Sequence, residues 1–426
     1  MKINRLIFAA AVAMASLTPL TMQAESNTVS PYSRFGYGML SDRSNAMQKG
    51  MGSVGYAMRS GREINFMNPA SYAAMDSLTF LFDMAADIKH LRTSDANEKG
   101  TNFTGGLDYI TLQAPLAKWI SASLGLAPIS SVGYSFGDEI ARGETSHSGS
   151  GDLNEIFLGV GVKPFKGFTA GVNVGYMFGT LVNSDYVYQT ATDETTGEVT
   201  TSTSLFEREI EVRDYSLRIG LQYGLPFLKE HELTVGLVYE PQKSFRGHAR
   251  GIRYDVAAET DPQYLADIPL KGNATMPELW GAGINYQWQQ RLMAEVDFTY
   301  QPWKGVKYAN IPEFGDATSQ FADRWRIGAG VQFINNLRGS WIQRVSYRLG
   351  GYYNRDYITV RGNNIREYGL TLGFGLPAPS SKTMVNLSLE YRNRRATPTP
   401  LVKEDYFVVT LGVNFNELWF WRNKLR

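Results

Sequence analysis

Segments of about ten residues along most of this chain alternate apolar side chains with polar or small ones, from about residue 78 to Phe415. In 325–333, for example, the apolar positions are Trp325, Ile327, Ala329, Val331 and Phe333, and the residues between them are Arg326, Gly328, Gly330 and Gln332. A period of two with one apolar face predicts a β-strand. Charged and polar groups on the other face suit a water-filled lumen, so the pattern favours a transmembrane β-barrel.

The alternation predicts fourteen strands, an even number as single-chain bacterial barrels have. They are expected near 78–90, 104–114, 118–136, 153–163, 167–180, 209–223, 232–240, 278–287, 291–301, 323–333, 343–354, 366–376, 383–392 and 405–415. Short connections alternate with long polar loops at 91–103, 137–152, 181–208, 241–277, 302–322, 355–365 and 393–404. Barrels in the outer membrane have tight periplasmic turns and long extracellular loops, which places both ends of the barrel on the periplasmic side.

A soluble sandwich also alternates along its strands, but it has no reason to sort its connections by length. We therefore expect an all-β fold, a transmembrane antiparallel β-barrel in the bacterial outer membrane. Aromatic residues near segment ends fit the girdles at the two membrane interfaces. They are Trp119, Tyr176, Tyr223, Tyr239, Trp280, Trp288, Trp303, Trp325 and Trp341.

Composition narrows the function. The net charge of +1 argues against a nucleic-acid partner. The chain has no cysteine, which excludes disulfides, thiolate metal sites and a lipoprotein anchor. The four histidines are scattered without metal-ligand spacing, and no Ser/His/Asp set suggests itself. We expect no catalytic residues, no metal and no cofactor, and hence a protein that is not an enzyme.

The first 24 residues are expected to be a signal peptide. Lys2 and Arg5 precede an apolar run from Leu6 to Leu17, and Ala24 offers a small residue for cleavage. The alternative is a membrane anchor, but the run is shorter than the eighteen or so residues of a spanning helix. The expected organisation is then a segment at 25–77, a barrel at 78–415 and a periplasmic tail at 416–426.

Residues 25–77 do not alternate and are rich in glycine. They carry Gly50-Met51-Gly52-Ser53-Val54-Gly55 and, further on, Asn68-Pro69-Ala70. The spacing of Gly50, Gly52 and Gly55 also matches a dinucleotide-binding fingerprint, but no strand precedes it. The two motifs, followed by about fourteen strands, resemble the long-chain fatty-acid transporter family, FadL. The opening Pro31-Tyr32-Ser33-Arg34-Phe35-Gly36-Tyr37-Gly38 is similar to its Bacteroidota members.

The resemblance implies that residues 25–77 fold inside the barrel as a plug. Asn68, Pro69 and Ala70 would then lie in the plug near the periplasmic half of the barrel. The alternative is a disordered periplasmic tail, which the many apolar residues of the segment disfavour. Pro128 and Gly125 lie in the third strand, where proline cannot donate to the ladder and a bulge is expected. In the FadL family a kink in that strand opens the wall sideways. The alternative for Pro128 is a bulge without function.

Two further groups of residues are candidate binding sites. The first comprises lumen-facing charges that either anchor the plug or bind a carboxylate headgroup: Arg218, Glu295, Asp297, Arg326, Arg348 and Glu390. The second lies in the connection at 241–277, where apolar residues either capture a ligand or pack as a lid over the barrel: Phe245, Tyr264, Leu265 and Ile268.

We therefore expect passive uptake of hydrophobic, fatty-acid-like small molecules, with lateral exit through the kinked third strand. The expected partners are membrane lipid, a hydrophobic ligand and other outer-membrane proteins. The alternative is a non-transporting barrel that serves as a subunit of a secretion or assembly complex. A continuous apolar passage would favour transport, and a sealed lumen would favour the subunit role.

Overall fold

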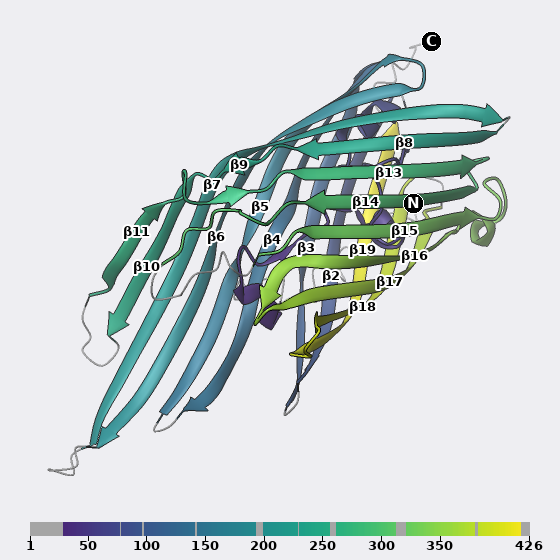
Figure 1. The fold of residues 1–426 in the computed structure, drawn as a ribbon. Helices are drawn as coiled ribbons and strands as arrows, with labels where there is room; N and C mark the ends of the chain where they lie inside the picture. The colour runs from purple at the N-terminus through teal and green to yellow at the C-terminus, as the bar shows by residue number, and fades with distance from the viewer. Residues whose placement is uncertain are drawn as a thin grey trace.

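The computed structural model describes residues 29–418 except 77, 96–97, 141–142, 193–198, 229, 256–260, 312–320 and 380–381. The expected signal peptide and the tail residues 419–426 lie outside this part of the chain. Within it, fourteen antiparallel strands pair with their sequence neighbours, and the last pairs with the first to close a barrel (Figure 1). The strands are β2 (Thr79–Ser94), β3 (Lys99–Ala117), β4 (Ile120–Ile140), β5 (Gly143–Phe165), β6 (Phe168–Thr192), β7 (Val199–Leu228), β8 (His231–Glu240), β13 (Leu279–Trp288), β14 (Leu292–Gln301), β15 (Arg324–Ile334), β16 (Ser346–Val360), β17 (Asn363–Pro377), β18 (Met384–Thr397) and β19 (Lys403–Leu418).

The predicted fold class and number of strands are confirmed. Along β14 the side chains of Glu295 and Asp297 are buried in the interior, while Val296 and Phe298 are about half exposed on the outer surface. This alternation gives the barrel an apolar surface for lipid and a polar interior. The last strand continues to Leu418, three residues beyond the barrel boundary predicted at 415. No helix in the described part of the chain is long and apolar enough to cross a membrane.

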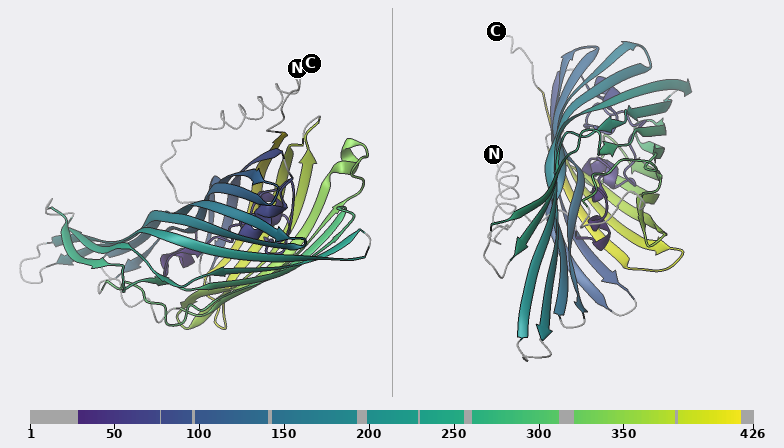
Figure 2. Two further views of the ribbon diagram at one scale, coloured as in Figure 1. Left: turned by 90° about the horizontal axis from the view of Figure 1, so that it is seen from above. Right: turned by 60° about the vertical axis from the view of Figure 1, so that its left-hand side comes forward.

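The predicted loops at 137–152 and 181–208 are wrong, because most of these residues extend the strands β4 to β7. The strand β7 has 30 residues whereas β8 has 10. About 9–11 residues suffice to cross a bilayer, so roughly 60 Å of β7 lies beyond the membrane at about 3.3 Å per residue. These long strands project together from one side of the barrel (Figures 1 and 2). We call their extracellular parts the wing.

The wing has further strands where the sequence predicted a loop at 241–277. The strand β10 (Gly247–Asp255) pairs with β7 on one side and with β11 (Gln263–Pro269) on the other. A separate two-stranded ladder joins β9 (Lys243–Ser244) to β12 (Thr275–Met276). On the short-turn side, a 3-10 helix η5 (Trp341–Arg344) connects β15 to β16.

Residues 29–76, which we call the N-terminal segment, lie inside the barrel (Figure 2). They contain η1 (Pro31–Arg34), β1 (Met39–Leu40), α2 (Ala46–Lys49) and η2 (Pro69–Ala74). Met51 in this segment is completely buried. Gly52 has φ +72°, and a Cβ there would lie within 3 Å of the carbonyl oxygens of Ala329 and Gly351 on the wall. Only glycine lets the backbone approach the wall so closely.

Candidate functional site

Two carboxylates of the wall hold the glycine motif of the N-terminal segment. Asp297 Oδ2 accepts hydrogen bonds from the N–H groups of Gly55 at 2.6 Å and Tyr56 at 3.0 Å. The neighbouring Glu295 accepts from the Ala57 N–H at 2.8 Å. Both side chains come from one face of β14, two residues apart, so they meet three consecutive donors. We call this pair the wall latch.

The Asn-Pro-Ala motif lies against β6 and β7. The Asn68 side chain donates to the Tyr56 carbonyl at 2.6 Å and accepts from the Ala70 N–H at 3.0 Å. These two bonds fix the start of η2 at Asn68 and connect it to the glycine motif. A Cβ on Gly171 of the wall would meet the backbone of Pro69 at 2.3 Å, so the motif packs directly on the strand.

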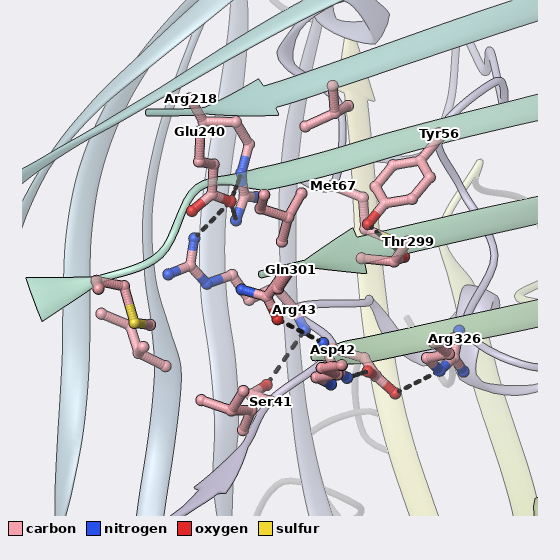
Figure 3. A pocket seen from close by; sticks show the side chains of 16 residues that line it. Ser41, Asp42, Arg43, Tyr56, Met67, Arg218, Glu240, Thr299, Gln301 and Arg326 are labelled. Atoms are coloured by element: carbon pink, nitrogen blue, oxygen red, sulfur yellow. Dashed lines mark hydrogen bonds and ion pairs between the residues drawn. The ribbon is translucent and has the colours of Figure 1, made fainter. Parts of the chain in front are cut away.

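Ion pairs connect the N-terminal segment to the wall above the latch (Figure 3). Arg43 lies 3.3 Å from Glu155 and 3.4 Å from Glu240, and Glu240 also bonds Arg218 at 2.7 Å. Asp42 lies 3.1 Å from Arg324, and its second oxygen lies 3.4 Å from Arg326. Burial would raise the pKa of Asp42, but the arginines Arg326 and Arg324 outweigh burial and hold it below its ordinary value.

The six predicted lumen charges all lie on the inner face, and each is at most 9% exposed. Four of them hydrogen-bond the backbone of the N-terminal segment directly. In addition to the latch, Arg218 donates to the Phe66 carbonyl at 2.8 Å and Arg326 to that of Gly52 at 2.8 Å. The remaining two hydrogen-bond wall residues: Arg348 donates to Asn386 and Gln332, and Glu390 accepts from Tyr352 and Arg392. Arg348 also attracts the Glu63 carboxylate of the N-terminal segment.

Two small cavities between the N-terminal segment and the wall are lined in large part by charged and polar side chains. The smaller one, about 50 Å³, is bordered by the Arg43, Arg218 and Glu240 cluster (Figure 3). The larger one, about 120 Å³, reaches Pro128 and Leu107 and contains the charged side chains of Lys49, Asp108 and others. Small-molecule sites typically measure about 300–1,000 Å³ and are mostly apolar. These spaces suit a few water molecules better than a hydrocarbon.

A buried cluster of aromatic residues, which we call the lid, lies on the extracellular side of the N-terminal segment. Trp303 is completely buried and stacks on Tyr357 with ring centroids 4.1 Å apart, while Tyr37 of the N-terminal segment packs edge-on against Phe245 and Tyr308. Hydrogen bonds join the same groups to the segment. The Tyr37 N–H donates to the Tyr357 hydroxyl at 3.0 Å, and the Tyr308 hydroxyl donates to a carbonyl at 2.9 Å. The expectation that Trp303 belongs to an interfacial girdle is therefore wrong.

The four residues expected to capture a ligand are divided by the structure. Phe245 is 1% exposed inside the lid, and Ile268 packs against the same cluster. Tyr264 and Leu265 on β11 are 69% and 39% exposed on the wing. The structure thus separates two lid residues from two surface residues and does not gather the four into one groove.

The ladder between the second and third barrel strands, β3 and β4, is shorter than those on either side of it. The strands β3 and β4 pair only from Ala117 with Ile120 up to Ile110 with Leu126. Beyond this point β3 stays with β2 and β4 stays with β5, and a bulge lies at Pro128. Gly125 pairs with Thr111, one position before the last pair of this ladder, and a Cβ there would meet the ring of Phe157 at 2.5 Å. We call the place where β3 (residues 99–109) and β4 (residues 127–140) no longer pair with each other the seam.

Sequence reasoning missed several residues that shape the interior. Asp42, Arg43 and the lid residues Tyr308 and Tyr357 come from segments without periodicity, so no pattern marked them. An excess of aromatic residues in the connection at 302–322 was the one available signal for the lid. In the described part of the chain, no group of three or more His, Cys, Asp or Glu side chains is placed to hold a metal ion.

Comparisons with known proteins agree with this architecture. The model of the family described as BamG matches residues 3–426. No curated protein matches the chain. Among solved structures, a Pseudomonas aeruginosa FadL homologue has a TM-score of 0.60 at 13% identity, covering 89% of this chain and 99% of that one. The P. putida toluene transporter TodX has 0.57 at 14%, covering 89% and 99%, and the CymD monoaromatic hydrocarbon channel has 0.58 at 14%, covering 88% and 97%.

At such low identity these likenesses establish the fold, which is that of outer-membrane channels for hydrophobic compounds. The protein is thus an outer-membrane β-barrel whose outer surface contacts lipid. Two of these solved proteins are described as a monoaromatic hydrocarbon channel and a toluene transporter. That this chain is not an enzyme stays a prediction.

Proposed function

The chain belongs to the BamG family and has the fold of outer-membrane hydrocarbon channels, and from this premise we propose that it is a closed barrel that serves as a subunit of an outer-membrane protein assembly. The observation that carries the proposal is the state of the interior. The N-terminal segment fills the lumen as a plug, the wall latch and ion pairs hold it, and the aromatic lid covers it.

A hydrophobic molecule that crosses this barrel would have to displace both the lid and the plug. The spaces beside the plug are lined by ion pairs, and transferring an apolar molecule into them would leave charged groups without solvation or partners. Outside the membrane, Tyr264 and Leu265 on β11 of the wing are exposed, and exposed apolar side chains of this kind suit contact with another protein. Both features favour a structural role over passage of a solute.

Uptake of hydrophobic molecules, with lateral exit at the seam, is the second candidate. The fold shared with the toluene transporter and the position of Pro128 beside the seam favour it. In this case Tyr264 and Leu265 would contact the ligand on the wing, and the plug and lid would have to move first. The Bacteroidota type suggested by the opening motif stays a prediction.

Native mass spectrometry of the detergent-extracted protein tests the proposal. We expect a second protein chain bound in fixed stoichiometry, together with low conductance of the intact barrel in planar bilayers. A barrel that is extracted alone, carries a hydrophobic compound and transports a radiolabelled aromatic hydrocarbon into vesicles would refute the subunit role and support uptake.

A further inference from the structure

The connection between β15 and β16 is longer than a turn requires. Two residues can join antiparallel strands, as 166–167 join β5 to β6. Residues 335–345 instead build a structure around η5 at the end of the barrel opposite to the wing (Figure 1). We call these residues the platform. The Trp341 indole N–H donates to the Pro377 carbonyl at 2.8 Å, which attaches the platform to the neighbouring turn between β17 and β18.

The platform exposes apolar side chains next to the lipid-facing wall. Leu337, Trp341 and Ile342 are 40%, 45% and 64% exposed. Where the connection joins the strands, Phe333 and Tyr347 pair across the ladder between β15 and β16 and are 40% and 41% exposed on the outer surface. Aromatic residues of this kind are enriched where a membrane meets water. The apolar surface of the platform therefore adjoins the surface that contacts lipid.

Basic side chains accumulate on the same side of the barrel. Arg338 and Arg344 belong to the platform, Arg291 to the turn before β14 and Lys382 to the turn before β18. Strand pairing of β14 with β15 and of β16 with β17 makes these three turns neighbours. None of the turns, 289–291, 335–345 and 378–383, contains aspartate or glutamate. The Arg291 guanidinium lies 5.9 Å from the ring centre of Phe333, so positive charge reaches the lipid-facing surface itself.

Charge and apolar surface together identify the ligand. Guanidinium groups bind phosphate oxygens through paired hydrogen bonds, and the exposed apolar side chains beside them suit acyl chains. A free phosphate would use only the basic groups. A phospholipid offers both parts in the matching order, with its phosphate at the turns and its chains along the wall. We propose that the platform and its two flanking turns bind an anionic phospholipid of the periplasmic leaflet. This site goes beyond the proposed function, because it would serve the barrel equally as a subunit or as a channel.

Native mass spectrometry of the full chain in detergent, titrated with phosphatidylglycerol, tests the site. Phosphatidylcholine, whose headgroup has no net charge, is the comparison lipid and should bind more weakly. Combining Arg338→Gln, Arg344→Gln and Lys382→Gln should weaken phosphatidylglycerol binding about a hundredfold, since each basic group beside an anionic headgroup contributes roughly fivefold. Binding of phosphatidylcholine should stay unchanged. Because Arg338 is exposed, the single variant Arg338→Gln keeps the fold and should show a loss of about fivefold by the same estimate.

A matched control removes the same charge from other short turns. Lys118, Lys163 and Lys166 are exposed at the turns that join β3 to β4 and β5 to β6, and these strands do not pair with β14 to β18. In about 0.15 M salt, exposed charges farther apart than about 8 Å are largely screened from each other. Combining Lys118→Gln, Lys163→Gln and Lys166→Gln should therefore leave the affinity for phosphatidylglycerol close to that of the wild type.

Four outcomes would overturn the inference. Equal binding of the two lipids would show that headgroup charge is not recognised, and an equal loss in the lysine control would show that only the total charge matters. Displacement of phosphatidylglycerol by inorganic phosphate would reveal a site for a free ion. An acidic protein that is extracted with the wild type and lost from the platform variant, while lipid binding persists, would make a protein the occupant. The subunit role is judged separately, by whether any second chain is bound.

Discussion

Replacing Asp297 with alanine tests whether the wall latch holds the plug in the lumen. Its carboxylate is 2% exposed and accepts from the N–H groups of Gly55 and Tyr56. Alanine cannot accept these bonds, and the two donors would remain buried between the plug and the wall. The expected result is a plug that leaves its site more often while the barrel, held by its closed ladder, stays folded.

The magnitude follows from the two lost bonds. A buried donor left without a partner costs about 1–3 kcal/mol, so two donors cost about 2–6 kcal/mol. Removing one of two adjacent carboxylates also relieves repulsion with Glu295, which offsets part of the loss. We therefore expect a net loss of about 3 kcal/mol in the stability of the docked plug. Since about 1.4 kcal/mol is a factor of ten, opening should increase roughly a hundredfold.

Hydrogen exchange at residues 55–57 and single-channel conductance in planar bilayers measure this effect. Exchange should accelerate roughly a hundredfold under conditions where opening limits it, and the conductance should show openings that the wild type lacks. Asp405→Ala is the matched control. The partners of Asp405 are Tyr391, Asn393 and Lys403, which all belong to the barrel wall, so this variant should leave the plug amides unchanged.

Exchange at residues 55–57 that stays within about threefold of the wild type would show that the latch does not hold the plug. The same conclusion would follow if the control variant accelerated exchange as much as Asp297→Ala. In either case the ion pairs of Asp42 and Arg43 would become the main attachment.

Three further predictions concern the plug, the lid and the seam. Burial raises the pKa of Glu63 to about 7 although Arg348 and Asn386 oppose the shift. Because this pKa lies above its ordinary value of 4.5, the wild type should lose up to about 3 kcal/mol of stability as the pH rises from about 4.5 to 7. Glu63→Gln should abolish that part of the pH dependence of denaturant unfolding; equal pH profiles would contradict it. Trp303→Ala should destabilise the lid by about 3–5 kcal/mol. The variant protein on intact cells should then be cleaved faster by an added protease. Resistance equal to that of the wild type would mean that the lid does not depend on this ring. Pro128→Val restores a backbone N–H donor at the bulge. If the proline keeps β3 and β4 apart, amide exchange at residues 127–129 should become slower in this variant. Unchanged exchange would mean that the plug, and not the proline, keeps the two strands apart.

The fourteen strands could be predicted from the sequence because their signal is local. A strand that faces lipid on one side and a polar lumen on the other must alternate along its own residues, as Val296 and Asp297 do. No knowledge of the neighbouring strand is needed for that inference. The same reasoning placed the charged residues of β14 on the inner face.

The wing escaped prediction because its strands lie beyond the membrane. Residues 181–190 and 203–208 lie beyond the membrane, so no apolar stripe is required of them, and their many polar residues resemble a loop. They are strands because neighbouring long strands pair with them across the sheet. Strand pairing of this kind is a property of the sheet and is not encoded in a short window of sequence.

The sequence by itself thus determined a barrel of fourteen strands, its outer and inner faces, and the apolar, glycine-rich character of the N-terminal segment. Only the tertiary structure decided which groups meet: Asp297 with the Gly55 N–H, Trp303 with Tyr357, and β1 with β4 at the seam. These contacts join residues far apart in the chain. They depend on the three-dimensional closure of the barrel, which hydrophobic periodicity along the chain cannot report.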